Sequence, residues 1–168
     1  MTKFQKFIKK KGLQIAMLTT VAGLIGIPIL FWFTSVITIG IGTLFILLFI
    51  SGTLGLWQWE FVKKYINMTY NNFAMYAFVG FGVCLVNFIL LLNYSIRIKS
   101  YSETYTISKH GYNNHIIYPA NRDYRAVKRN LTPYFNEHVN TLSSAKTITV
   151  KFDTGLFGMD MIDDCTFN

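Results

Sequence analysis

Side chains that could bind a metal ion or act as acids and bases gather in the C-terminal part of the chain, from residue 110 onward. They are three histidines and an acidic segment with one cysteine: His110, His115, His138, Asp160, Asp163, Asp164 and Cys165. A zinc site usually shows a regular ligand spacing, such as His-x-x-x-His on a helix or Cys-x-x-Cys in a turn. None of these residues has such a spacing. We therefore expect surface histidines and a solvated acidic segment, with no metal ligand and no cofactor.

A second chemical pattern is Asp153-Thr154-Gly155, which follows an apolar stretch and matches the three-residue signature of aspartic peptidases. That chemistry needs a second aspartate close to the first. Only thirteen residues follow Gly155, which is too short for the required sheet even in a symmetric dimer. We expect a turn at the end of a strand instead.

Catalysis by a thiol needs a lowered pKa and a neighbouring base. The sequence neighbours of Cys165 are acids, which oppose a thiolate, so we expect no catalytic role for it. Cys84 lies within an apolar run, and two such distant cysteines do not indicate a disulfide framework. No catalytic residue is predicted. The alternative is a small membrane-bound enzyme that uses His110, His115 or the segment 160–165.

Two long stretches contain no charged side chain, and they decide the class of the protein. The first runs from Gly12 to Trp59 and the second from Tyr65 to Ile96. A bilayer core about 30 Å thick needs roughly 20 apolar residues to be crossed by a helix. The first stretch is long enough for two crossings and the second for one. We predict an integral membrane protein with three transmembrane helices and a small C-terminal α+β domain.

The predicted boundaries define a basic tail, a membrane region and an extramembrane domain, at residues 1–12, 13–94 and 95–168. Within the membrane region we expect helices at about 13–33, 36–57 and 73–94. Only Thr34 and Ser35 remain for the turn between the first two helices. A connection this short makes them an antiparallel hairpin.

Small residues and one amide indicate how the helices pack. Gly23 and Gly26 permit close approach of the first helix to a neighbour, and Ser51 and Gly55 form a small-xxx-small face on the second. Such a face packs against helices of the same chain or forms a seam between copies in a homo-oligomer. Asn87 is a polar residue in the interior of the third predicted helix, and we expect it to hydrogen-bond a neighbouring helix. The three predicted helices contain no aspartate, glutamate, lysine, arginine or histidine, which argues against an ion-coupled transporter.

Tryptophans at the ends of the runs predict where the helices meet the bilayer interface. Trp32 lies near the end of the first predicted helix, and Trp57 and Trp59 lie at the end of the second. Aromatic rings of this kind are enriched at both membrane interfaces. We expect these three residues to act as interface anchors.

Uneven positive charge predicts the orientation. Residues 1–11 contain five lysines, and the loop 60–72 adds two more on the same side if there are three crossings. Basic loops favour the cytoplasmic side. We expect a cytoplasmic N-terminus and a C-terminal domain on the periplasmic side of a bacterial inner membrane, although three basic residues that follow the third run oppose this. The topology signals are Lys9, Lys10, Lys11, Lys63 and Lys64. They explain the net charge of +8 without nucleic acid as a partner.

The C-terminal domain shows the alternation of short strands. We expect strands at 101–108, 115–118 and 146–152, a turn at 153–158, and a returning partner strand within 159–167. Pro133–Leu142 fits a short helix capped by Thr132. A domain of this size is marginal in isolation, so it is expected to lean on the membrane or a partner.

These features favour a non-enzymatic integral membrane protein. We expect an accessory or partner-binding subunit of a larger membrane complex, with the C-terminal domain as its interaction module. An immunity-type protein that neutralises a membrane-acting toxin is an alternative of the same binding class. The expected partners are the lipid bilayer and other membrane protein subunits.

Overall fold

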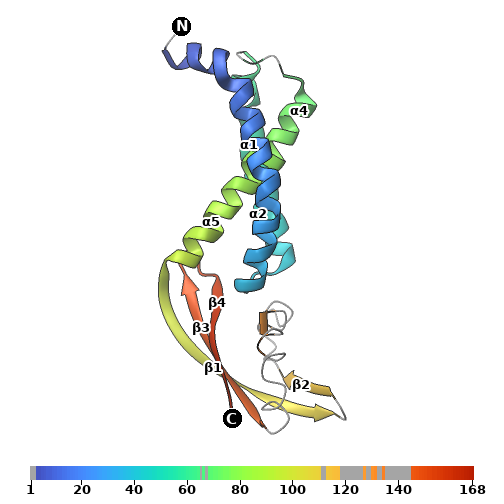
Figure 1. Cartoon of the computed structure of the whole chain (residues 1–168), viewed down its shortest axis with the longest axis vertical. Coiled ribbons are helices and arrows are strands. Elements are labelled where there is room, and N and C mark those ends of the chain that lie inside the picture. Colours follow the sequence, from blue (N-terminus) through green and yellow to red (C-terminus); the bar gives the residue numbers. More distant parts are fainter. Residues whose placement is uncertain are drawn as a thin grey trace. The chain divides into compact units, whose positions relative to one another are not determined.

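The computed structural model describes residues 3–64, 66, 68–110, 113–117, 127, 130, 131, 134 and 145–168. The chain forms two compact units (Figure 1). Unit 1 comprises Met1–Trp32 and Gly42–Leu90, and unit 2 comprises Phe33–Ile41 and Leu91–Asn168. Unit 1 is helical, whereas unit 2 contains the last turns of two helices and an antiparallel sheet.

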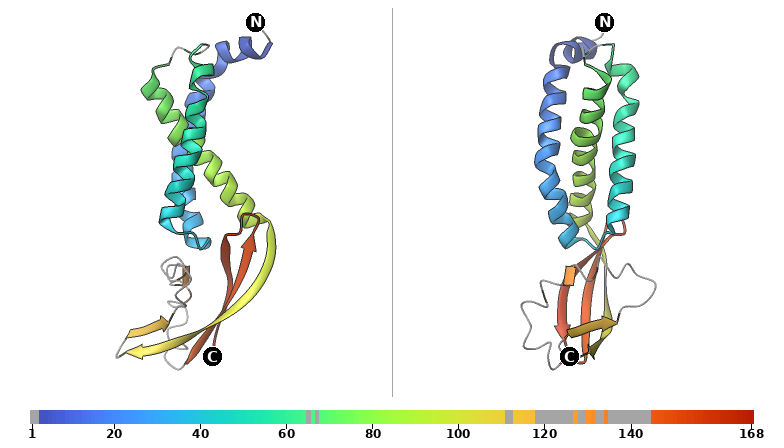
Figure 2. Two further views of the ribbon diagram at one scale, coloured as in Figure 1. Left: turned by 180° about the vertical axis from the view of Figure 1, so that it is seen from behind. Right: turned by 90° about the vertical axis from the view of Figure 1, so that its right-hand side faces the viewer.

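The helical elements range from 4 to 34 residues, and the longest of them are apolar. From the N-terminus they are α1 (Lys3–Val36), α2 (Ile41–Trp57), α3 (Trp59–Val62), α4 (Tyr70–Met75), the π-helix η1 (Tyr76–Gly82) and α5 (Val83–Ser95). α4, η1 and α5 follow one another without a break and form a single helical run. Within unit 1 this run lies between α1 and α2 (Figure 2, right). Two helices are long and apolar enough to cross a membrane, Lys10–Val36 and Tyr70–Ser95, and α2 is a shorter apolar helix of 17 residues.

The connection between α1 and α2 differs from the prediction. The expected turn at Thr34 and Ser35 is wrong, because α1 continues through both residues and ends at Val36. The second helix therefore begins at Ile41 rather than near residue 36. The residues between them leave the helix because they pair with a strand far along the chain, through an antiparallel bridge between Ile37 and Met161.

Glycines set the spacing of the helices in unit 1. A Cβ atom on Gly23 of α1 would lie 1.8 Å from the carbonyl oxygen of Val79. A Cβ on Gly80 would lie 3.1 Å from the backbone of α1, and one on Gly82 would lie 3.3 Å from the backbone nitrogen of Gly52 in α2. Residues two apart on a helix face different directions. Gly80 and Gly82 thus let the helical run Tyr70–Ser95, called the central run below, touch α1 and α2 at once.

The sheet of unit 2 has four antiparallel strands in the order β2-β1-β3-β4. They are β1 (Arg97–His110), β2 (Asn113–Ile117), β3 (Thr147–Gly155) and β4 (Asp160–Phe167). The predicted pairing of the last two strands is confirmed, with Val150 opposite Cys165. The predicted strands 101–108 and 115–118 correspond to β1 and β2, which pair antiparallel, although β1 continues to His110 and β2 begins at Asn113. The predicted helix Pro133–Leu142 lies outside the described residues except for Tyr134.

One face of the sheet carries the core of unit 2. β3 alternates buried Ile148, Val150 and Phe152 with less buried neighbours, as expected for a strand with one covered face. The core also contains Tyr105, Val127, Leu131 and Ala145. The opposite face, called the outer face below, carries short hydroxyl side chains at positions that alternate with the core residues: Ser100, Ser102, Thr104, Thr149 and Thr166.

Candidate functional site

Polar side chains of unit 2 gather at the end of the sheet where β1 follows α5. Two irregularities of strand register place them there, because the pairing skips Ile98 in β1 and Asp163 in β4. An extra residue of this kind is a β-bulge, which redirects neighbouring side chains. The skip at Ile98 brings Arg97 opposite Gly155 and Ser100 opposite Asp153, so that Arg97 and Ser100 share the outer face.

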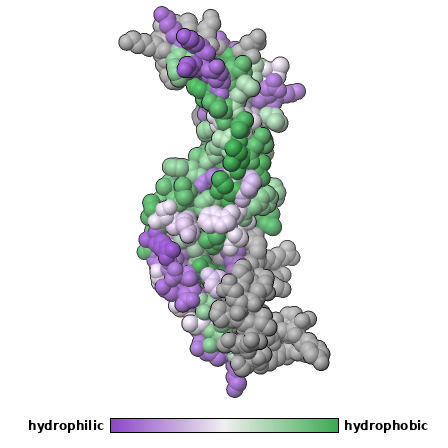
Figure 3. Space-filling view, viewed as in Figure 1, coloured by the Kyte–Doolittle hydropathy of each residue, from purple (hydrophilic) through white to green (hydrophobic). Residues whose placement is uncertain are grey.

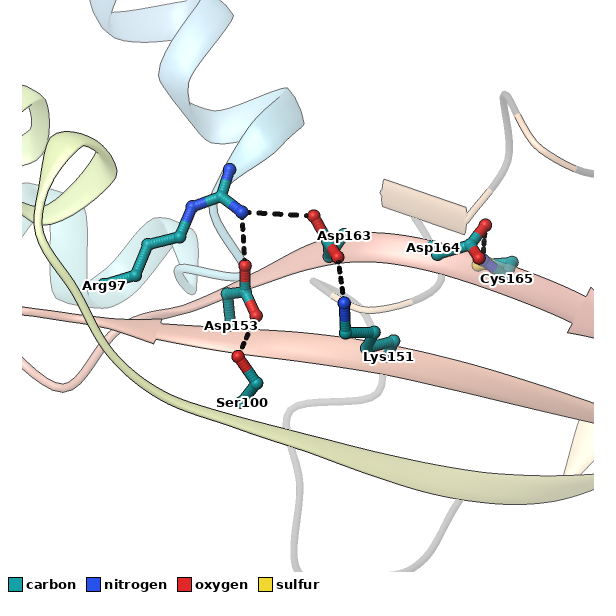
Figure 4. Close-up of polar contacts among 7 residues, drawn as sticks. All are labelled: Arg97, Ser100, Lys151, Asp153, Asp163, Asp164 and Cys165. Atoms are coloured by element: carbon teal, nitrogen blue, oxygen red, sulfur yellow. Dashed lines mark hydrogen bonds and ion pairs between the residues drawn. The ribbon is translucent and has the colours of Figure 1, made fainter.

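Five residues form a charged cluster on this face: Arg97, Ser100, Lys151, Asp153 and Asp163 (Figure 4). Arg97 Nη1 donates to Asp153 Oδ2 at 2.5 Å, and Ser100 Oγ donates to Asp153 Oδ1 at 2.6 Å. Arg97 Nη1 also lies 3.2 Å from Asp163 Oδ1, and Lys151 Nζ lies 2.6 Å from Asp163 Oδ2. The Asp153 side chain is 4% exposed and that of Arg97 is 52% exposed. In this cluster the half-exposed side chain of Arg97 therefore pairs with the buried carboxylate of Asp153.

The stabilisation from the ion pair between Lys151 and Asp163 depends on pH. The hydrogen bond from Lys151 lowers the pKa of Asp163, and the same bond raises the pKa of Lys151. A lowered acid pKa means that the stabilisation is lost as pH falls below about 4, through the folded pKa of Asp163. A raised lysine pKa means that it is lost above about pH 10.4. The pair is intact at neutral pH.

Asp160 joins three segments of unit 2. Thr38 donates through its backbone N–H and its Oγ1 to the Asp160 carbonyl oxygen, at 2.8 and 2.7 Å. The Asp160 carboxylate accepts from Tyr101 Oη and from Thr154 Oγ1, both at 2.7 Å. One residue of β4 thus fixes the α1–α2 connection, β1 and β3 to one another.

Asn93 fixes the turn between β3 and β4 to the last turn of α5. Its side chain is fully buried, and its Nδ2 donates to the Met159 carbonyl oxygen at 3.1 Å. Its Oδ1 accepts from the backbone N–H of Phe157 at 2.9 Å. A Cβ on Gly155 would lie 2.1 Å from the Asn93 carbonyl oxygen, so only glycine allows this approach. The backbone of the turn therefore touches the helix end directly.

The Asp-Thr-Gly pattern has no free carboxylate. Asp153 and Thr154 belong to β3 rather than to the predicted turn, which comprises only Leu156–Gly158. Asp153 is neutralised by Arg97 and buried, so it cannot polarise a water for peptide hydrolysis. Gly155 serves the contact with Asn93. The pattern is explained by strand packing.

The predicted chemical residues do not converge in the described part of the chain. His110 ends β1, ten positions beyond Ser100, which corresponds to about 33 Å of strand. His115 pairs with Ser108 at the same far end, and His138 lies outside the described residues. Among the described residues, no group of three or more histidine, cysteine, aspartate or glutamate side chains could hold a metal ion.

Cys165 is held as a thiol. It packs against the core of unit 2, and burial, followed by the charge of Asp164, raises its pKa to about 12. Its thiolate fraction at neutral pH is therefore far too small for nucleophilic chemistry.

No protein-family model matches the chain, and no curated protein or solved structure matches it either.

The residues predicted to pack the helices lie in unit 1. Asn87 Nδ2 donates to the Gly26 carbonyl oxygen at 2.9 Å, which joins the third run to α1. Ser51 is buried, and a Cβ on Gly55 would lie 3.1 Å from Ala77. Gly23 contacts the backbone of Val79, where a Cβ would lie 1.8 Å from the carbonyl oxygen.

The predicted anchors and topology signals are mostly exposed. Trp32 and Trp57 expose their rings, whereas Trp59 packs against Phe73 with ring centroids 5.0 Å apart. Of the signal lysines, Lys9 lies within α1, Lys10, Lys11 and Lys64 are exposed, and Lys63 pairs with Glu60 at 2.6 Å.

Unit 1 also has an apolar groove of about 670 Å³ between α1 at residues 13–21 and the segment 68–76. Three methionines contribute to its lining: Met17, Met68 and Met75. Such a lining accepts an apolar chain but carries no reactive group.

Sequence reasoning missed Thr38, Asn93 and Arg97, which fasten the helix ends to the sheet. Their partners lie more than 50 residues away, at Asp160, Met159 and Asp153. The one available signal was Asn93 itself, an amide at the end of an apolar run.

Proposed function

We propose that the chain is a non-enzymatic integral membrane protein that crosses the bilayer three times and presents unit 2 to a partner in a larger membrane complex. The observation that carries the proposal is the exposure of the apolar helices. Only 22% of the most apolar window of α1 and 33% of that of Tyr70–Ser95 is buried. A core helix of a water-soluble protein would be buried over most of this surface.

The exposed surface has the composition of a lipid-facing surface. Large apolar side chains point outward from all three long helices, as on the face shown in Figure 3, while Gly23, Gly52 and Gly80 face inward. Burial against lipid would remove this apolar area from water. Some of the most exposed are Leu18, Ile25, Phe31, Phe45, Phe49 and Phe88.

The third crossing is supported by the length and surroundings of α2. Its 17 residues span about 26 Å, at the lower limit for a membrane helix. It packs along the central run through Gly52 and Gly55, so it shares that run's course. α3 extends the helical path after a single turn residue, Gln58. Three crossings place the N-terminus and unit 2 on opposite sides, with the lysine-rich side cytoplasmic.

Topology gives the first test. In a chain with Cys84→Ser and Cys165→Ser, single cysteines are introduced by Lys64→Cys or Ser102→Cys, both at exposed positions. With sealed cells and a membrane-impermeant maleimide, we expect labelling at position 102 and none at 64 until the membrane is opened. The reverse pattern, labelling at position 64 and none at position 102, would mean two crossings and would remove α2 as a membrane span. Equal labelling at both positions would mean that Tyr70–Ser95 does not cross.

The outer face of the sheet is the surface that we assign to the partner. Ser102, Thr104 and Thr166 are exposed on it, and the hydroxyls of Thr104 and Thr149 lie 3.1 Å apart. Short hydroxyl side chains lose little conformational entropy on binding and both donate and accept hydrogen bonds. A polar partner surface fits this face better than an apolar peptide does.

Recovery of partners tests the function. From mild detergent, the full-length chain with a C-terminal tag is expected to retain other membrane proteins in stoichiometric amounts, detected by mass spectrometry. Thr104→Arg should lower this recovery at least severalfold, whereas the matched exposed variant Gln58→Arg should not. Recovery of the chain alone would contradict the subunit role. A membrane-acting toxin as the retained protein would identify the immunity-type version.

A further inference from the structure

We propose that the β3–β4 turn is a second membrane contact, in which Leu156 and Phe157 insert into the bilayer interface beside the end of α5. This inference rests on the proposed membrane function. Leu156 is 41% exposed and Phe157 is 47% exposed, at adjacent positions of a tight turn.

The distribution of exposed apolar side chains in unit 2 points to this site. Besides Leu156 and Phe157, the large apolar residues that the described part of unit 2 exposes lie at helix ends or at the start of β1: Ile41, Leu91, Tyr94, Ile96 and Ile98. From Lys99 onward, the described side chains of β1, β3 and β4 expose none. In the described part of unit 2, the exposed apolar surface thus lies at the end of the sheet next to α5.

Strand register places the turn beside the helix. Arg97 pairs with Gly155 in antiparallel strands, so the residues that follow Gly155 extend past the start of β1 toward α5. The two hydrogen bonds of the buried Asn93 hold the turn there, at the Phe157 N–H and the Met159 carbonyl. α5 ends the proposed crossing Tyr70–Ser95, and the end of a crossing helix lies at the headgroup level. The turn is therefore at that level as well.

The turn is built to tolerate this environment. Residues 154–159 contain no charged side chain, so insertion does not desolvate a charge. Gly155 N–H donates to the Met159 carbonyl and Gly158 N–H donates to the Gly155 carbonyl, which satisfies backbone groups that lipid cannot. Gly158 has a φ of +73°, the left-handed conformation that glycine adopts without strain. Arg97 and Lys99 lie just after the end of α5, at the level where cations meet lipid phosphates.

Depth measurement with a spin label tests the proposal. The full-length chain with Cys84→Ser and Cys165→Ser is reconstituted in phosphatidylglycerol and phosphatidylcholine vesicles, and a nitroxide is attached after Phe157→Cys. Oxygen concentrates in the bilayer and a nickel chelate stays in water, so the ratio of their collision rates reports depth. We expect position 157 to favour oxygen. Ser102→Cys supplies an aqueous reference and Phe88→Cys, on the exposed face of α5, supplies a lipid reference.

Each outcome decides the matter. A label at 157 that favours the chelate, as at 102, or that is shielded from both reagents by protein, overturns the membrane contact. If position 88 also favours the chelate, the proposed membrane function itself has failed. Leu156→Ser is a second variant that keeps the turn. It should shift the label at 157 toward water if the two side chains insert together, and an unchanged label would contradict joint insertion.

Discussion

Replacing Gly23 with alanine is expected to be among the most destabilising single changes in unit 1. The new Cβ would lie 1.8 Å from the carbonyl oxygen of Val79 and 2.8 Å from the Cα of Gly80, both backbone atoms that cannot rotate away. α1 must then separate from the central run by more than an ångström, which also weakens neighbouring contacts. Overpacking of this kind costs about 1–3 kcal/mol, and we expect about 3 because backbone is struck.

Gly42→Ala is the matched control for this prediction. Gly42 also lies in a helix, but a Cβ there would meet no atom within 4 Å. The substitution should be neutral or stabilising by a few tenths of a kcal/mol, because alanine has the higher helix propensity. Tryptophan fluorescence during heating in mild detergent reports both variants, since the three tryptophans lie in unit 1. Equal melting temperatures for the two variants would show that α1 does not touch the central run at Gly23.

The apolar runs made much of the architecture predictable. A charge-free stretch indicates a helix through its length alone. Two of the three predicted membrane helices correspond to Lys10–Val36 and Tyr70–Ser95. The last two strands were predictable because Ile148, Val150 and Phe152 alternate with polar residues, and a Gly-containing turn follows them. Both signals are local, so they survive without knowledge of the fold.

The missed features depend on contacts between distant residues. Ile37 leaves the helical path because Met161 offers a strand edge, and neither residue signals the other in sequence. The bulge at Ile98 decides which face Arg97 occupies, yet a bulge becomes visible only when the partner strand is known. Without it, Asp153 looks like a turn residue with a free carboxylate. The candidate site was therefore less predictable than the helices.

Removal of Arg97 is expected to destabilise unit 2 by about 2 kcal/mol, because the Asp153 carboxylate would keep only Ser100 as its partner in the charged cluster. Breaking a buried ion pair by deleting one partner costs about 3–5 kcal/mol. The expected loss of stability is smaller here because the Arg97 side chain is 52% exposed and water screens part of the interaction. Arg97→Met retains the apolar stem and removes the charge.

Asp153→Asn in the same chain separates the ion pair from general damage. It removes the buried charge, so the double variant Arg97→Met/Asp153→Asn should lose less stability than the two single variants combined, by at least about 1 kcal/mol. Asp163→Asn is the matched control, since that side chain is 26% exposed and should cost well under 1 kcal/mol.

Labelling of Cys165 in a Cys84→Ser chain reports these changes inside unit 2, where the tryptophans give no signal. Cys165 is partly buried and its pKa is raised to about 12, so opening of the strands is expected to speed its reaction. A loss of 2 kcal/mol should raise the labelling rate about 30-fold when opening and closing are fast. If Arg97→Met and Asp163→Asn raise it equally, Asp153 is not the charge that Arg97 stabilises. Strict additivity in the double variant would lead to the same conclusion, because two residues that share a buried ion pair cannot act independently.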